Sequence, residues 1–140
     1  MSLRAGLAAV MLWSTMAQTA AADVLVWIDI SEQEMKVARD GQGLYQWPVS
    51  TGRPGKRTPT GVFTAQWLDA DHKSSIYDNA PMPWSIFFIG GVAIHGTDQI
   101  ASLGQPVSGG CVRLHPDHAK TLYAMVAEDG LANTTIVVVR

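Results

Sequence analysis

The sequence predicts one mainly β domain with a single short α-helix near the C-terminus. Runs rich in β-branched and apolar residues, separated by turns that contain glycine or proline, recur between residues 24 and 114. Helical spacing occurs in one region, where the apolar residues fall on one helical face: Ala119, Leu122, Tyr123, Val126 and Ala127. A chain of 140 residues that is 47% hydrophobic is long enough for one buried core.

The first strands are expected to form a hairpin. Residues 24–30 are the first strand, and a short alternating piece at residues 35–37 precedes Asp40-Gly41. An Asp-Gly step between two such runs is a strong hairpin signal. Residues 44–50 are the expected return strand, in which Pro48 indicates an edge or a bulge.

Further strands are expected at residues 62–67, at residues 84–95 with an interruption at Gly90-Gly91, and at residues 135–139. The polar segment 69–79 is expected to be irregular. The longer stretch 69–83 is either a lid over a site or an ordinary connection.

The N-terminus has the layout of a secretory signal peptide. Arg4 precedes an apolar stretch at residues 5–13, and small residues at 20–22 offer a cleavage site. The apolar stretch is too short to span a membrane, and the alternative is an N-terminal helix of the fold. We therefore expect a signal peptide at residues 1–22 and an exported, soluble domain at residues 23–140.

Charge and cysteine content exclude several classes of protein. The formal net charge is −2 and no lysine- or arginine-rich run occurs, so no nucleic-acid partner is expected. The small basic cluster at residues 53–57 is interpreted as a solvated turn. Cys111 is the single cysteine, so no intrachain disulfide can form. From the count alone it is a buried small hydrophobe, an intermolecular bridge or a reactive thiol.

The neighbours of Cys111 favour the reactive thiol. Gly109 and Gly110 give a substrate room to approach, and a tight turn here can aim the N–H groups of Gly110 and Cys111 at one point, as an oxyanion hole requires. Arg113 lies on the same side of an extended segment as Cys111, where it can bind a carboxylate. His95 is the candidate base, because it ends an apolar strand and is followed by a glycine.

The other three histidines have simpler interpretations. His72 lies in the polar segment as a solvated side chain, while His115 and His118 are surface or capping residues at the start of the helix. A competing hypothesis is a zinc site, since Cys111, His115 and His118 form a C-x3-H-x2-H pattern. Pro116 interrupts that pattern and no fourth ligand is adjacent.

These motifs together resemble the YkuD-type L,D-transpeptidase catalytic domain over residues 24–140. The strand ending in Ile94-His95-Gly96-Thr97 and the segment Ser108-Gly109-Gly110-Cys111-Val112-Arg113-Leu114 carry the resemblance. The segments at residues 48–52, 58–63 and 77–83 are also similar to sequence signatures of that family. The resemblance implies a YkuD-like β-sandwich with a short helix.

The resemblance also implies a chemistry. Cys111 would be the nucleophile and His95 the proton carrier, with its ring oriented by a backbone carbonyl such as that of Gly96; Gly110 would belong to the same catalytic turn. Substrate-binding residues would be Arg113, Ser108, Gly109 and Thr97. No metal and no organic cofactor is implied.

The implied reaction is acyl transfer in peptidoglycan. Cys111 would attack the L-to-D peptide bond of a stem tetrapeptide and release D-alanine. An amine of another stem, or of an outer-membrane lipoprotein, would then resolve the thioester. The implied location is periplasmic or associated with the cell wall, and carbapenems would acylate the thiol. Alternatives that stay open are an L,D-carboxypeptidase with the same Cys-His pair and a non-catalytic wall-binding homologue.

The chain departs from the family pattern at Gly109, where the motif usually reads Ser-His-Gly-Cys. Glycine removes an imidazole two residues before the thiol. If that loss limits the rate, Gly109→His should raise activity; if the turn has adapted to glycine, it should not.

Overall fold

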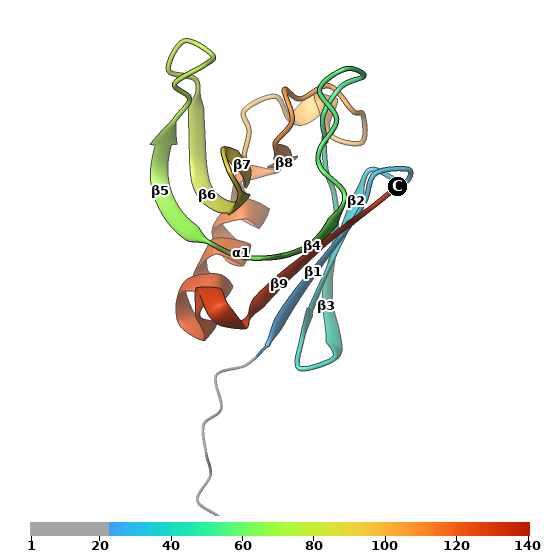
Figure 1. Cartoon of the computed structure of the whole chain (residues 1–140), viewed down its shortest axis with the longest axis vertical. Coiled ribbons are helices and arrows are strands. Elements are labelled where there is room, and N and C mark those ends of the chain that lie inside the picture. The colour runs from blue at the N-terminus through green and yellow to red at the C-terminus, as the bar shows by residue number, and fades with distance from the viewer. Residues whose placement is uncertain (1–22) are drawn as a thin grey trace, which may run out of the picture.

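Two β-sheets and one α-helix make up the computed structural model, which describes residues 23–140 (Figure 1). The sheets have the strand orders β3-β2-β1-β9-β4 and β5-β6-β7-β8. The elements are β1 (Val24–Asp29), β2 (Glu34–Arg39), β3 (Gln42–Pro48), β4 (Gly61–Thr64), β5 (Trp67–Lys73), β6 (Pro81–Ile89), β7 (Val92–Gly96), β8 (Val112–Leu114), α1 (Pro116–Asp129) and β9 (Thr134–Val139). Short 3₁₀ turns cover Ile100–Ser102 and Leu131–Asn133. The mainly β class with one C-terminal helix is confirmed.

The expected signal peptide, residues 1–22, lies outside the described residues. Within residues 23–140, no helix is long and apolar enough to cross a bilayer.

The five-stranded sheet is built around β1. β1 pairs antiparallel with β2 and parallel with β9, and β4 pairs antiparallel with the other side of β9. Burial alternates along β1, β2 and β9, as expected for a sheet with one face on the core. The buried side chains include Val26 of β1, Val37 of β2 and Ile136 of β9, whereas Trp27 is 41% exposed on the outer face.

The Asp40-Gly41 hairpin is confirmed. Asp40 and Gly41 have φ angles of 50° and 78°. Positive φ at both central residues is the geometry of a type I′ turn, whose twist matches that of the strands it joins. The hairpin joins β2 to β3, which forms the edge of its sheet and ends at Pro48.

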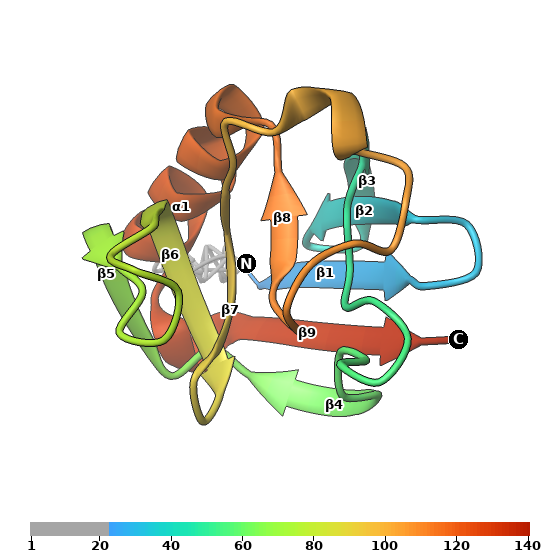
Figure 2. The ribbon, with the colours of Figure 1, turned by 90° about the horizontal axis from the view of Figure 1, so that it is seen from above.

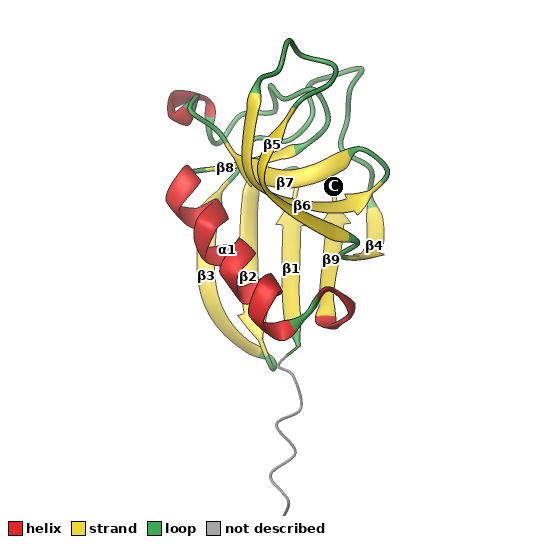
Figure 3. Ribbon diagram, turned by 90° about the vertical axis from the view of Figure 1, so that its left-hand side faces the viewer, coloured by secondary structure: helices red, strands yellow, loops and turns green. Residues whose placement is uncertain are grey.

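The core lies between the two sheets and α1. Figure 3 shows the helix lying across the strands of the five-stranded sheet, beneath β6 and β7. Leu122 and Val126 of α1 are buried in one cluster with Phe88 of β6, Ile94 of β7 and Val112 of β8. The four-stranded sheet therefore has one face on this core and the other face free for a site.

The polar segment after residue 66 differs from its expectation. Residues 67–73 form β5, and the chain leaves the first sheet after Thr64 to enter the second. The expectation of an irregular segment at 69–79 is therefore wrong for 69–73. Aspartate and lysine are rare in strands. Here the antiparallel pairing of β5 with β6, at one edge of the sheet, outweighs that low propensity.

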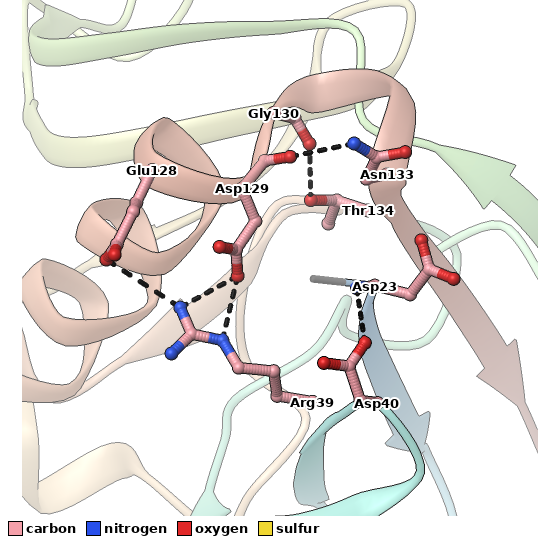
Figure 4. Close-up of polar contacts among 8 residues, drawn as sticks. All are labelled: Asp23, Arg39, Asp40, Glu128, Asp129, Gly130, Asn133 and Thr134. Carbon is pink, nitrogen blue, oxygen red and sulfur yellow. Dashed lines mark hydrogen bonds and ion pairs between the residues drawn. The ribbon is translucent and has the colours of Figure 1, made fainter. Parts of the chain in front are cut away.

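An ion pair joins the end of α1 to the five-stranded sheet (Figure 4). Arg39 of β2 donates from Nε to Asp129 Oδ2 at 2.8 Å, and its Nη2 lies 2.7 Å from the same oxygen. The Asp129 side chain is only 8% exposed, while Glu128, 3.7 Å from Arg39, is 75% exposed. Asp129 is therefore the partner that depends on the guanidinium.

We expect Arg39→Ala to lower the urea midpoint of unfolding clearly, because the buried Asp129 carboxylate loses its counter-charge. Glu128→Ala should leave the midpoint nearly unchanged, since exposed pairs contribute little. Equilibrium urea unfolding of both variants tests this. Equal midpoints for the two variants would contradict the assignment of Asp129 as the dominant partner.

Candidate active site

Strand alternation gathers the expected catalytic residues on the free face of the four-stranded sheet. β7 and β8 are parallel, with His95 paired to Arg113 and Ile94 paired to Val112 (Figure 2). Ile94 and Val112 point into the core, so His95 and Arg113 point to the other face. Cys111 shares that face, because it packs on Ala93, Met82 and Phe87 in a separate small cluster.

The register places Cys111 beside Ala93, one same-face position before His95. The Ala93 N–H donates to Cys111 Sγ at 3.5 Å. Same-face neighbours along a strand are about 7 Å apart. Cys111 and His95 therefore share one face of the sheet, and proton transfer between them stays a prediction.

The thiol of Cys111 is held in its neutral form. It is partly buried, and Sγ lies 3.9 Å from the Gly91 carbonyl oxygen, to which it can donate. Burial raises the pKa of this thiol, while the Ala93 N–H and the positive charge of Arg113 oppose that rise. At neutral pH the group is a protonated thiol that needs a base in order to react.

His95 is a neutral base with a fixed tautomer. Its side chain is buried, and Nδ1 donates to the Gly96 carbonyl oxygen at 2.7 Å, as the resemblance implies. That bond leaves Nε2 unprotonated as the acceptor. The pKa of His95 is lowered to about 4: burial is the main cause, the Gly96 carbonyl opposes it, and the nearby charges of Arg113 and His72 add to the lowering.

The turn before Cys111 is closed by Ser108. Ser108 is buried, and its Oγ donates to the Cys111 carbonyl at 2.6 Å and accepts from the Gly110 N–H at 3.1 Å. Gly110 has φ +131°, a conformation that favours glycine. The Gly110 N–H is thus engaged within the turn, and the Cys111 N–H, for which residues 23–140 provide no acceptor, is the donor left for an oxyanion. Ser108 shapes the turn, and its contact with a substrate stays a prediction.

Two upstream segments brace this turn, a role that their sequence did not reveal. Ser50 exchanges backbone hydrogen bonds with Arg113 at 3.1 and 2.9 Å, and the Ser108 N–H donates to the Thr51 carbonyl at 3.0 Å. Thr58 Oγ1 donates to the Gly110 carbonyl at 2.7 Å and accepts from the Gly52 N–H at 3.0 Å. The segments at 48–52 and 58–63 therefore hold the nucleophile turn in place.

The remaining expected residues lie around this centre. Arg113 is half-buried, and its Nη1 lies 3.3 Å from Gln99 Oε1. Thr97 is buried and its Oγ1 accepts from the Gln99 N–H at 3.1 Å, which makes it a support of that loop. Gly96 packs closely against Pro116 of α1, where a Cβ would lie 3.2 Å from the Pro116 Cα. Contacts of Arg113 and Thr97 with a substrate stay predictions.

The zinc hypothesis finds no support in this geometry. His115 Nδ1 accepts from the Asp117 N–H as the N-cap of α1, which confirms a capping role. His118 stacks on Trp47 with ring centroids 4.7 Å apart. Within residues 23–140, no group of three or more potential ligands is placed to hold a metal ion.

Sequence reasoning missed an aromatic and ionic cluster on the same face. Trp67 stacks on Phe87 with ring centroids 3.7 Å apart, and the ring of His72 lies edge-on to Phe87. His72 Nδ1 lies 3.0 Å from Asp69 Oδ2. The interpretation of His72 as a solvated side chain is therefore wrong: β5 brings it onto the sheet, where its side chain is 26% exposed.

The pKa of His95 predicts how stability depends on pH. Folding lowers the pKa of His95, so the unfolded chain binds a proton more readily than the folded protein does. The free energy of unfolding is therefore highest above pH 6.5, the unfolded pKa, and decreases as the pH falls towards about 4. The loss should be on the order of 3 kcal/mol. Urea unfolding at pH 7 and pH 4 should show a smaller loss in His95→Gln than in the unsubstituted protein. An equal loss in both proteins would contradict the buried neutral state.

Comparisons with known proteins agree with this architecture. The family model described as YkuD, L,D-transpeptidase catalytic domain, matches residues 23–139. An L,D-transpeptidase from Mycobacterium smegmatis is similar with a TM-score of 0.75 and 28% identity, covering 85% of this chain and 59% of that one. The L,D-transpeptidase (Yku) from Stackebrandtia nassauensis gives 0.73 and 27%, covering 84% and 56%.

The LD transpeptidase LdtMt1 in complex with imipenem gives a TM-score of 0.76 and 25% identity, covering 84% of this chain and 59% of that one. This chain thus spans less than two thirds of the length of each of these structures. Comparison with curated protein sequences gave no match. Because the family model covers nearly all of the described residues, the chain belongs to the YkuD family of L,D-transpeptidase catalytic domains.

Proposed function

We propose that this domain is a peptidoglycan L,D-transpeptidase in which Cys111 is the nucleophile and His95 the base. The observation that carries the proposal is the shared sheet face of the two side chains, with His95 Nδ1 bonded to the Gly96 carbonyl and Nε2 free. Family membership supports the reaction class. The acyl donor is a stem tetrapeptide, cleaved at its L-to-D bond.

In the first half-reaction a covalent acyl-enzyme forms. The thiol proton passes from Sγ to His95 Nε2 while Sγ bonds to the peptide carbonyl carbon, and the Cys111 N–H donates to the developing oxyanion. The C–N bond then breaks, and the D-alanine amine takes the proton from His95. The product is a thioester on Cys111 with both side chains neutral again.

In the second half-reaction an amine of another stem peptide, or of a lipoprotein, attacks the thioester carbon. His95 takes a proton from this amine and returns a proton to the departing sulfur, so the free thiol is restored. Both side chains begin and end each half-reaction uncharged, in agreement with the raised pKa of Cys111 and the lowered pKa of His95.

Arg113 is proposed to hold a carboxylate of the donor. Its side chain shares the sheet face with Cys111, and Gln99 supports the guanidinium from one side. Guanidinium groups bind carboxylates in two-pronged fashion, which fixes orientation as well as distance. Export to the compartment that contains peptidoglycan, through residues 1–22, belongs to the same proposal.

Removing either reacting group should abolish turnover while the fold is kept. We expect Cys111→Ala and His95→Ala each to reduce conversion of a disaccharide tetrapeptide by at least about 10³-fold. Mass spectrometry of the products measures this. His115→Asn is the matched control, because it removes an imidazole but keeps a good helix cap, and it should leave turnover unchanged.

The products decide between the enzymatic alternatives. A crosslinked dimer supports transfer, and a tripeptide without dimer supports a carboxypeptidase. No conversion by the unsubstituted protein, together with a thiol that resists acylation, would indicate a wall-binding homologue and contradict the proposal.

A carbapenem gives an independent test of the nucleophile. Sγ is expected to attack the β-lactam carbonyl and open the ring, with the proton ending on the ring nitrogen, so the protein mass should rise by one intact imipenem. A complex with imipenem is known for the similar LdtMt1. Cys111→Ala should show no adduct. An unchanged mass for the unsubstituted protein after long incubation would contradict a competent thiol.

A further inference from the structure

At residue 109 a neighbouring side chain occupies the space that a Cβ would need. Gly110 has φ +131°, whereas the φ of Gly109 lies outside the left-handed region. The φ angle at position 109 therefore does not by itself favour glycine. The atoms that surround position 109 explain the glycine instead.

Tyr77 fills that space. An ideal Cβ built on Gly109 would lie 2.5 Å from Tyr77 Oη and 2.8 Å from both Cζ and Cε2 of the same ring. Carbon atoms in good contact are about 3.5–4.0 Å apart, so even a methyl group at position 109 would displace the phenol. Gly109 and Tyr77 are thus complementary in size.

The tip of the β5–β6 hairpin aims Tyr77 at the turn. In Figures 1 and 3 this tip lies at the same end of the molecule as the segment that precedes β8. Ser74 is buried, and its Oγ accepts from the N–H groups of Ile76 and Tyr77 at 3.2 and 2.9 Å. The Ala80 N–H donates to the Tyr77 carbonyl at 3.0 Å. These bonds fix the backbone of Tyr77, while Ile76 is 80% exposed.

We propose that Tyr77 is a positioning residue for the acyl donor. Gly109, which has no side chain, leaves the space in which the Tyr77 ring reaches the nucleophile turn. The inference rests on the proposed function. The phenol stands over the backbone two residues before Cys111 and remains 47% exposed, so a donor that approaches this turn would meet the ring as a wall. In this chain a tyrosine from the hairpin occupies the place that a side chain at residue 109 would take.

This arrangement revises the expectation for Gly109→His. An added imidazole has no room while Tyr77 lies on the turn, so the single substitution should open the hairpin tip and weaken donor binding. Gly109→Ala should do the same with the smallest possible side chain. Once Tyr77 is gone, a side chain at position 109 has nothing left to displace.

The test is a double-mutant cycle on acylation by imipenem, followed by intact-protein mass spectrometry. Tyr77→Ala and Gly109→Ala should each raise the half-saturating concentration about tenfold, with a maximal rate within about threefold of the original. The double variant should be no worse than either single one, and Tyr77→Phe should keep most of the binding, since the ring forms the wall. Ile76→Ala and Gly43→Ala, where a Cβ meets nothing within 4 Å, are the matched controls and should change neither value.

A second readout separates this inference from the proposed function. Alkylation of Cys111 by iodoacetamide needs no transpeptidase activity, and loss of the wall should accelerate it equally in Tyr77→Ala, in Gly109→Ala and in the double variant. Hydrogen exchange of residues 74–80 should rise in Gly109→Ala. If imipenem fails to acylate the unsubstituted protein, alkylation and hydrogen exchange still test whether the Tyr77 ring shields Cys111. Unchanged alkylation and exchange in Gly109→Ala, or effects that multiply in the double variant, would overturn the inference.

Discussion

The parallel pairing of β7 with β8 is the constraint on which the site depends. β8 has only three residues, so its position is set by β7 on one side and by the backbone bridge to Ser50 on the other. This pairing fixes which side chains meet. Ile94 and Val112 point into the core. Because side chains alternate along a strand, His95 and Arg113 point to the opposite face.

Hydrogen bonds to the backbone, rather than charges, hold the reacting groups. The turn that carries Cys111 is fastened by Ser108, Thr51 and Thr58, and the imidazole of His95 is fastened by a carbonyl. Burial keeps both the thiol and the imidazole neutral. Such a pair develops charge only when a substrate is attacked, which is the moment at which hydrogen-bond donors are most effective.

Features with strong local signals could be predicted from the sequence. Asp40-Gly41 specified its hairpin because both residues tolerate positive φ, and the helix from Pro116 to Asp129 has a proline start and a glycine stop. The candidate pair of Cys111 and His95 also followed from local patterns, since each lies next to glycine in an apolar setting.

What could not be predicted depends on contacts between distant segments. Four of the seven residues of β5 are polar or charged, and the segment is a strand because β6 pairs with it. The engagement of the Gly110 N–H by Ser108 depends on the exact course of the turn. Tyr77 and Gly109 are 32 residues apart in the sequence. The one sign of their contact in the sequence is a glycine at position 109.

The protonation state of His95 is the central claim, because it decides whether Cys111 has a base. Nitrogen NMR of the imidazole between pH 4 and pH 8 tests it most directly. We expect a proton on Nδ1, a bare Nε2 throughout the neutral range and a titration near pH 4. A ring that carries its proton on Nε2, or that titrates near 6.5, would contradict it.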